Sequence, residues 1–413
     1  MKYTKYNDQY VFPINGQQPV MTLNSNRLGL FTTPPADGEE IDIDELIPKI
    51  NALEKELNSQ LIRMEAPIHL CINGLLSSNN VFLYSKPGAA KTTLAGKFGE
   101  AIGNYFKINF TPETTKNDIF GPVSINGVKE GKWIREWSGI AGAHIVLVDE
   151  FFKGSSAIRN ALLDVCEERK VSDAEGSKSI PILLLIAASN EIIDPNESNA
   201  MWDRFGLRGE VKYPSRANDL ENLFSSATGR LPIQTKLDPD ELLLLQGIVE
   251  LRAKNLSKSL IEPMIKVLQN LTKNDINNSP RRSLAWSRSI VAEAMLAQEE
   301  VNLNHIEIGA NILWIDPKDK NKVSETVMSV SNPERMFVLH TRRDLEELSE
   351  LVKKNNNRNE MVNYSVSIKK IIKAIDKQKG KIDPIELSEI TEIATNLLHD
   401  TLMKATDLVA PVN

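Results

Sequence analysis

Lys91 and Thr92 follow a short loop that contains glycine, and their side chains suit the binding of phosphate groups. Residues 81–84 form an apolar run typical of a buried strand, and the apolar positions after the loop indicate a helix. At such a junction backbone N–H groups can surround a phosphate, a lysine can contact its oxygens and a threonine hydroxyl can help to hold Mg²⁺. The spacing therefore predicts a phosphate-binding loop.

The loop departs from the strict pattern G-x-x-x-x-G-K-[ST], because Ser85 and Ala90 occupy its two glycine positions. For Ser85 we leave open whether it weakens nucleotide binding or changes its selectivity. The loop can form with Ala90 only if that residue avoids a positive φ angle, and we expect that it does. The predicted phosphate-binding residues are Ser85, Pro87, Gly88, Ala89, Ala90, Lys91, Thr92 and Thr93.

Two further apolar stretches end in polar residues that could complete the chemistry. Residues 145–150 end in Asp149 and Glu150, which suit a Mg²⁺ ligand and a base for attacking water. Residues 183–190 end in Asn190, an amide that could orient the same water. Because the carboxyl ends of parallel strands meet at one sheet edge, we expect these side chains near Lys91. Any one stretch could be a plain core strand, but the three together favour ATP hydrolysis, with Thr92 and Asp149 as metal ligands.

The elements that position these residues predict an α/β core, a parallel sheet flanked by helices of the phosphate-loop NTPase type. We assign residues 41–215 to this domain and residues 216–315, where only helical patterns occur, to an all-helical lid. Residues 316–413 are predicted to be a mostly helical C-terminal region. Residues 1–40 are expected to be an irregular extension that packs on the domain or reaches a neighbouring subunit.

The three strands resemble those of the MoxR group of AAA+ ATPases, and so do residues 202–205 (WDRF) and 279–282 (SPRR). Residues 63–71, 119–125 and 187–191 are similar to the RavA-like branch of that group. The resemblance implies that ATP or ADP binds with Mg²⁺. It also implies a ring, of six subunits, that remodels or matures a separate protein partner. In relatives that partner commonly has a von Willebrand factor A domain.

The resemblance also assigns roles to arginines beyond the sheet. Arg204 matches the arginine finger that enters a neighbouring subunit's site, with Arg208 as its rival. Arg281 matches a lid arginine that contacts the γ-phosphate within its own chain, and Arg282 is the alternative. With Glu150 and Asn190, Arg204 and Arg281 complete the predicted catalytic set.

In the family, the region of residues 111–143 carries an insertion that projects toward the central channel of the ring. Several glycines there favour a hairpin and turns over a long helix. A surface hairpin with Trp133 and Trp137 packed on the domain is the equal alternative.

The 413 residues have a net charge of −6, which argues against a general nucleic-acid binder. A DNA-acting ring is therefore the less favoured alternative. A nucleotide-controlled scaffold with little hydrolysis is another, because of Ser85 and the missing glycines. Cys71 and Cys166 lie in apolar contexts and are expected to be buried thiols of a cytoplasmic protein, and no segment has the length of a membrane span.

Overall fold

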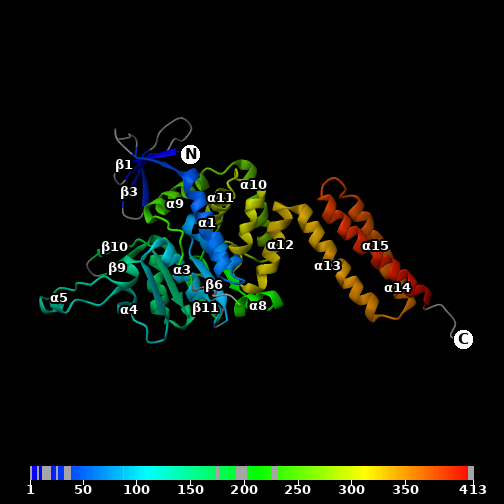
Figure 1. Ribbon diagram of the computed structural model, residues 1–413, viewed down its shortest axis with the longest axis horizontal. Coiled ribbons are helices and arrows are strands. Elements are labelled where there is room, and N and C mark those ends of the chain that lie inside the picture. The colour runs from blue at the N-terminus through cyan, green and yellow to red at the C-terminus, as the bar shows by residue number, and fades with distance from the viewer. Residues whose placement is uncertain are drawn as a thin grey trace. The chain divides into compact units, whose positions relative to one another are not determined.

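The computed structural model describes residues 2–6, 9–11, 20–24, 27–31, 39–86, 88–173, 176–191, 202–225 and 231–407 (Figure 1). By its internal contacts the chain divides into two compact units, Met1–Val323 and Ser324–Asn413. The first unit contains the sheet and the residues singled out above. The second unit is helical.

A parallel five-stranded sheet forms the centre of the first unit, in the order β12-β6-β11-β8-β7. Its strands are β6 (Val81–Ser85), β7 (Tyr105–Asn109), β8 (Ile145–Asp149), β11 (Leu184–Ser189) and β12 (Leu207–Val211). The apolar residues of β8 and β11 are buried, as expected for parallel strands covered on both faces. This sheet confirms the predicted α/β class.

Helices surround this sheet. Its strands contact α2 (Glu65–Ser77) and α3 (Lys91–Ile102), and α6 (Ser156–Glu168) shares its apolar core. Helix α1 (Ile43–Gln60) packs against α2 and α3. Ser155 caps α6 by accepting a hydrogen bond from the N–H of Ile158. Aromatic rings fill the core beside β6 and β8, with Phe82 in edge contact with Trp202 and Phe205.

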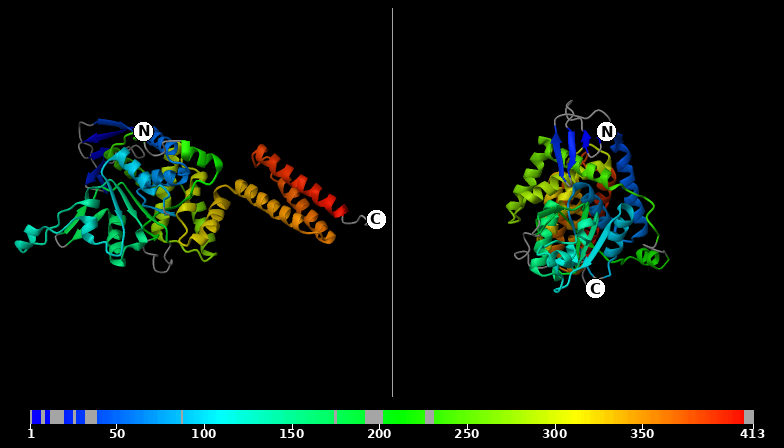
Figure 2. Two further views of the ribbon diagram at one scale, coloured as in Figure 1. Left: turned by 60° about the horizontal axis from the view of Figure 1, so that its bottom comes forward. Right: turned by 90° about the vertical axis from the view of Figure 1, so that its left-hand side faces the viewer.

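Residues 116–143 form short elements: α4 (Lys116–Phe120), α5 (Ile125–Lys129) and the 3₁₀ turn η1 (Gly139–Gly142). A bridge between Val123 and Arg135 closes the hairpin that carries α5, which projects from the body of the unit (Figures 1 and 2). Trp133 is 54% exposed, whereas Trp137 packs against the core. Of the two tryptophans expected to pack on the domain, only Trp137 does so, and the projection toward a central channel stays a prediction. Two other short elements follow, η2 (Phe151–Lys153) and the hairpin of β9 (Lys170–Asp173) and β10 (Gly176–Ser179).

The chain after β12 is helical. It contains α8 (Ala217–Ser225), α9 (Pro239–Lys254), α10 (Lys258–Thr272), α11 (Pro280–Ala297), η3 (Leu303–Asn311), η4 (Pro317–Asp319) and α12 (Lys320–Ser331). Asp238 caps α9 by accepting hydrogen bonds from the N–H groups of Asp240 and Glu241. In this predicted all-helical region, η3 is a 3₁₀ segment and not an α-helix. The domain bounds given above stay predictions.

The second unit contains α13 (Pro333–Lys354), α14 (Arg358–Asp376) and α15 (Pro384–Asp407). Its core repeats every seven residues along α13 and α14, a spacing typical of helices packed side by side. The buried residues are Val338, Leu345 and Val352 on α13 and Met361, Ile368 and Ile375 on α14.

Before α1, the described residues form an antiparallel sheet in the order β4-β3-β2-β1-β5. Its strands are β1 (Lys2–Tyr6), β2 (Gln9–Val11), β3 (Val20–Asn24), β4 (Arg27–Phe31) and β5 (Glu39–Asp42). This differs from the predicted irregular extension, in which one short strand near Tyr10 was expected. Strands of three to five residues are too short for apolar alternation to be detected reliably.

Candidate functional site

The loop between β6 and α3 has the backbone of a phosphate-binding loop. Gly88 has a φ of +78°, and Ala90, directly before α3, has a φ of +54°. Lys91 opens the helix and is buried. The expectation that Ala90 avoids a positive φ is therefore wrong. An alanine in this left-handed region costs about 1–2 kcal/mol, so the tight turn into α3 is held against local strain. Pro87 lies outside the described residues.

Lys91 reaches across the sheet edge to the end of β8. Its amine lies 3.4 Å from Oδ1 of Asp149, with the two side chains 6% and 19% exposed. Thr92 is exposed beside it, and its hydroxyl accepts a hydrogen bond of 3.2 Å from Lys107 on β7. Sequence reasoning missed Lys107, although its place two residues before the end of a neighbouring strand was a usable signal.

Glu150 follows β8 in a left-handed conformation, with a φ of +50°. Its N–H donates to Oδ1 of Asp149 at 3.0 Å, which turns the two acids in different directions. Lys153 lies 3.4 Å from Oε2 of Glu150 as an ion pair. At this turn, the carboxylate of Asp149 therefore faces Lys91, and that of Glu150 pairs with Lys153.

Three buried polar atoms at this edge have no hydrogen-bond partner among the described residues. They are Oγ of Ser85, Oε2 of Glu150 and Oδ1 of Asn190. Ser189 pairs with Tyr84 in the β11–β6 ladder, so Asn190 follows next to Ser85. Buried polar atoms are normally satisfied, so three at one edge indicate that this edge receives a polar ligand. With Lys91, Thr92 and Asp149, they fit a nucleotide polyphosphate and Mg²⁺.

A smaller cavity of about 260 Å³ adjoins the phosphate loop. Leu61 and Met64 from the α1–α2 connection line it, with Thr93 of α3, Tyr213 beyond β12 and Leu223 of α8. Its mostly apolar lining and size suit a nucleobase. Of these residues, sequence reasoning singled out only Thr93 as a ligand-binding residue, because the others come from separate segments that carry no nucleotide-binding motif.

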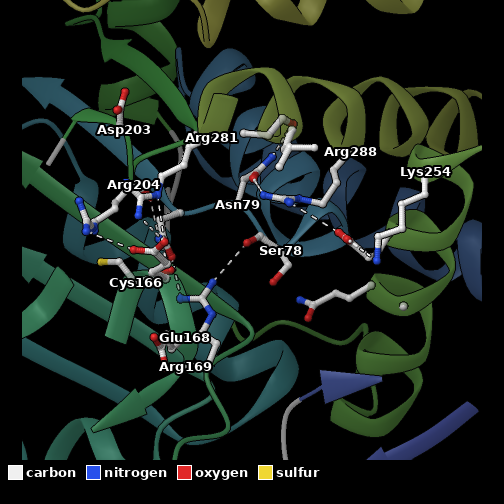
Figure 3. Close-up of a pocket in the computed structure, with 18 of the residues that line it drawn as sticks. Ser78, Asn79, Cys166, Glu168, Arg169, Asp203, Arg204, Lys254, Arg281 and Arg288 are labelled. Atoms are coloured by element: carbon white, nitrogen blue, oxygen red, sulfur yellow. Dashed lines mark hydrogen bonds and ion pairs between the residues drawn. The ribbon is translucent and has the colours of Figure 1, made fainter. Parts of the chain in front are cut away.

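Arg204 and Arg281 lie together at the opposite edge of the sheet (Figure 3). They line a pocket of about 540 Å³, which Ser78 and Asn79, just before β6, also line. Both guanidiniums contact Glu167: Nη2 of Arg204 lies 3.1 Å from Oε2, and Nε and Nη2 of Arg281 donate to Oε1 at 2.9 and 2.6 Å.

The neighbouring arginines have structural contacts instead. Arg208 is fully buried, donates to the carbonyl oxygens of Ile312, Trp314 and Trp202, and lies over both tryptophan rings. Burial lowers the pKa of Arg208. These contacts favour Arg204 over Arg208 as the finger.

Arg282 is 3% exposed and donates to Asp203 at 3.0 Å and to the carbonyl oxygens of Leu313 and Asn277. The side chain of Arg281, in contrast, is 50% exposed. The geometry therefore favours Arg281 over Arg282 as the lid arginine that meets a ligand.

The structure does not bring Arg281 to Lys91. The pocket of Arg281 lies at the amino end of β6 and Lys91 beyond its carboxyl end, so the five residues of the strand, about 16 Å, separate them. The expected contact of Arg281 with the γ-phosphate of its own chain does not fit this arrangement. The reason is the packing of α11 against α2 on the flank of the sheet.

Three comparisons relate this chain to known proteins. Residues 48–246 match the family model described as the MoxR domain in the MoxR-vWA-beta-propeller ternary systems. An uncharacterized protein of Methanocaldococcus jannaschii is 28% identical over 314 residues, 74% of this chain and 82% of that protein. Chaperone MoxR1 of Mycobacterium tuberculosis is 28% identical over 279 residues, 62% of this chain and 72% of that protein. Over residues 48–246 the chain is therefore similar to the MoxR domain.

A crystal structure from Cytophaga hutchinsonii, of a protein named as a candidate ATPase, has the same fold. Its TM-score is 0.57 at 18% identity, and the match covers 69% of this chain and 95% of that one. This likeness shows that the fold is a known one.

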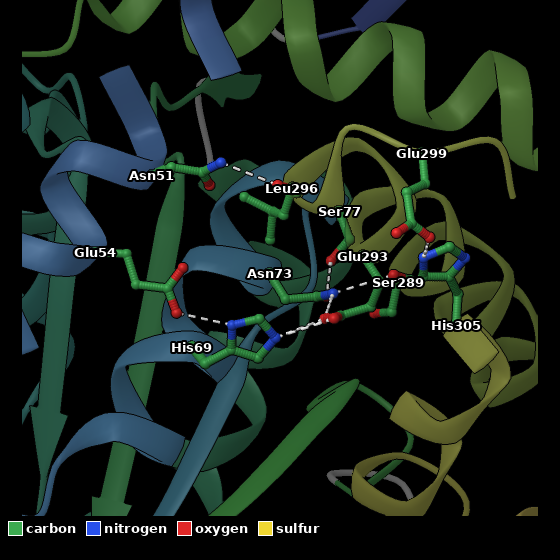
Figure 4. Close-up of polar contacts among 10 residues, drawn as sticks. All are labelled: Asn51, Glu54, His69, Asn73, Ser77, Ser289, Glu293, Leu296, Glu299 and His305. Carbon is green, nitrogen blue, oxygen red and sulfur yellow. Dashed lines mark hydrogen bonds and ion pairs between the residues drawn. The ribbon is translucent and has the colours of Figure 1, made fainter. Parts of the chain in front are cut away.

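Polar contacts fix helix α11 to α1 and α2 of the core (Figure 4). His69 of α2 lies between two carboxylates, with Nδ1 2.8 Å from Glu54 of α1 and Nε2 3.0 Å from Glu293 of α11. The hydrogen bonds to Glu293 and then Glu54 raise the pKa of His69 to about 10. Asn73 donates to Glu293 at 2.6 Å and to the carbonyl oxygen of Ser289. A charged imidazole therefore links three helices.

Within the described ranges, no helix has the length and apolar character needed to cross a bilayer. In the same part of the chain, no group of three or more His, Cys, Asp or Glu residues is arranged to hold a metal ion. Cys71 and Cys166 are buried and free, as predicted, and burial raises the pKa of both thiols, that of Cys166 to about 12. Cys166 also lines the pocket of Arg204 and Arg281.

Proposed function

We propose that the chain hydrolyses Mg-ATP at the edge where β6, β8 and β11 end. The observation that carries this proposal is the convergence of the Lys91–Asp149 ion pair with the unsatisfied atoms of Ser85, Glu150 and Asn190. A cation, a carboxylate pair and an amide on one sheet edge are the groups that phosphoryl transfer requires.

The phosphate loop would bind the polyphosphate through backbone N–H groups and Lys91. These N–H groups belong to Gly88, Ala89, Ala90, Lys91, Thr92 and Thr93, where α3 begins. Thr92 and Asp149 would hold Mg²⁺, which neutralises charge on the phosphates. The base would occupy the cavity lined by Leu61, Met64 and Tyr213.

Glu150 and Asn190 would act on the attacking water. The carboxylate of Glu150 accepts a proton from the water, and the amide oxygen of Asn190 accepts a hydrogen bond that orients it. Neither Oε2 of Glu150 nor Oδ1 of Asn190 has a hydrogen bond among the described residues, and the carboxylate of Glu150 has an ion pair with Lys153.

Arg204 and Arg281 would serve the site of a neighbouring subunit. They lie at the sheet edge opposite to Lys91, so a second copy has to present its own phosphates to them. Arginine donors aimed at a γ-phosphate stabilise the charge of the transition state. A ring of subunits satisfies this geometry at every interface, and we propose six, as in the MoxR and RavA-like proteins that the sequence resembles.

The work of the ring would be the remodelling or maturation of a separate protein partner. The support is the description of the matched family model, which names vWA and β-propeller components, and the chaperone name of the mycobacterial relative. A partner with a von Willebrand factor A domain is therefore our first choice. The cytoplasmic location predicted from the sequence stays a prediction.

One observation favours a second function, a scaffold that nucleotide binding controls with little hydrolysis. Ala90 is strained at a φ of +54°, and Ser85 stands where the usual pattern has glycine. A DNA-acting ring has no comparable support.

Replacement of Glu150 by Gln tests the proposal and separates these two functions. The hydrolytic account predicts unchanged ATP affinity and a loss of turnover, because the amide cannot take the proton. Steady-state phosphate release is measured at high protein concentration, with the parent protein as reference. A parent that binds ATP but releases no phosphate would favour the scaffold, and full turnover in Glu150→Gln would reject Glu150 as the base.

A further inference from the structure

Glu167 is the carboxylate on which Arg204 and Arg281 converge. One carboxylate oxygen faces Arg281, with donor distances of 2.9 and 2.6 Å, and the other lies 3.1 Å from Arg204. The three residues come from the end of α6, the turn before β12 and the first turn of α11. A single side chain thus ties the lid arginine to the core arginine.

The place of Glu167 is unfavourable for its own helix. It lies in the last turn of α6, which contains no basic residue, and the helix C-terminus carries partial negative charge. Arg169, the C-cap, donates to Asn80 and to the carbonyl oxygen of Ser78. The contacts that favour a glutamate here are therefore those with Arg204 and Arg281. An acidic residue at a helix C-terminus, where it is locally unfavourable, is typical of a functional constraint.

The charges of this cluster suit the reception of an anion. Two guanidiniums and one carboxylate leave a net positive charge, and without the carboxylate the guanidiniums would repel each other. Glu167 engages Nε and Nη2 of Arg281, whose side chain is 50% exposed. A guanidinium has five N–H donors, so Arg281 keeps donors for a phosphate while Glu167 holds it.

We propose that Glu167 is a positioning residue that holds Arg204 and Arg281 as one receptor for the terminal phosphate of ATP bound to a neighbouring subunit. This inference rests on the proposed function. Glu167 does not contact the nucleotide, and it acts only through the two arginines. It also makes the receptor depend on the docking of α11, because Arg281 belongs to that helix.

The test compares Glu167→Gln with Glu168→Gln in the full-length assembled protein. Both residues are exposed at the end of α6, but only Glu167 has an ion pair with an arginine among the described residues. We expect Glu167→Gln to lower kcat by about 10- to 100-fold, the loss typical of a misplaced catalytic group. ATP affinity should change less than about twofold, because the Lys91 loop is untouched. Glu168→Gln should match the parent.

A double-mutant comparison separates positioning from general stability. In a protein that already carries Arg204→Ala and Arg281→Ala, Glu167→Gln should have no further effect on kcat, because nothing is left to position. Thermal unfolding and sedimentation of each variant report folding and assembly independently of activity. An equal loss of kcat in both backgrounds would overturn the positioning role.

The outcomes also distinguish the two proposals. A full loss of activity in Arg204→Ala with normal kcat in Glu167→Gln would reject the role of Glu167 and leave the proposed function intact. Full activity in the Arg204→Ala, Arg281→Ala protein would reject the role of both arginines in a neighbouring site, whereas a parent protein that releases no phosphate from ATP would reject the proposed function itself.

Discussion

The amine of Lys91 lies 3.4 Å from Oδ1 of Asp149 and joins the first turn of α3 to the end of β8. The lysine is 6% exposed and the aspartate 19%, so solvent screens this ion pair less than one at the surface. The pair places opposite charges where a phosphate and a divalent cation would each find a partner. The pairing of β11 with both β6 and β8 fixes the ends of these strands, and so the positions of Lys91 and Asp149, relative to each other.

Lys91→Ala should abolish most ATP binding while the fold remains. The loss of a charge-assisted contact to phosphate is worth about 1.5–3 kcal/mol, or roughly 10- to 150-fold in affinity. Titration with a fluorescent ATP analogue measures this affinity. Lys86→Ala is the matched control, because Lys86 is an exposed lysine of the same loop. Its replacement should lower ATP affinity much less than that of Lys91. Equal affinities for parent and folded Lys91→Ala would refute the assignment of the phosphate site.

Ala90→Gly should stabilise the protein. Glycine removes the strain of a φ of +54°, about 1–2 kcal/mol, and loses about 0.5–1 kcal/mol in chain entropy, so a net gain of about 0.5–1 kcal/mol is expected. Gly88→Ala is the reverse control, because a Cβ there meets open space at a φ of +78° and only strain is added. Urea unfolding measures both. A loss of stability in Ala90→Gly would show that the alanine is not strained.

The His69 cluster should make stability depend on pH. Its folded pKa of about 10 exceeds the ordinary value of 6.5, so its contribution is complete below pH 6.5 and is lost as the pH rises toward 10. The side chain is 37% exposed, so solvent screening reduces the contribution to about 1 kcal/mol.

Unfolding in urea at pH 7 and pH 9.5 checks this prediction. The free energy of unfolding should fall more for the parent than for His69→Gln, which cannot titrate. The same fall in both proteins would assign the pH dependence to other groups.

The carboxyl edge of the sheet could be predicted because its chemistry is local in sequence. Lys91, Asp149 and Asn190 each follow an apolar run, and parallel strands bring such ends together. The conformation of Ala90 could not be predicted, because the requirement of the loop for a left-handed residue overrides the preference of alanine.

The amino edge was harder to predict. Glu167 lies 114 residues from Arg281, and no motif links them. Where Arg281 lies depends on how α11 packs against α2, which is decided by contacts such as Asn79 with Ala285 and Ser289. The exclusion of Arg208 and Arg282 likewise required their burial to be known.

Mixing Lys91→Ala with Arg204→Ala tests the central claim most directly, namely that a phosphate loop of one subunit works with an arginine of its neighbour. Alone, each protein should be nearly inactive, and the ATPase rate of Arg204→Ala should be about 10³- to 10⁵-fold below that of the parent. In an equal mixture about a quarter of the interfaces should pair an intact Lys91 with an intact Arg204 and recover about that share of parental ATPase activity. Co-sedimentation of differently tagged chains establishes that mixed assemblies form. The account predicts this recovery; no recovery in proven mixed assemblies, or full activity of Arg204→Ala alone, would contradict it.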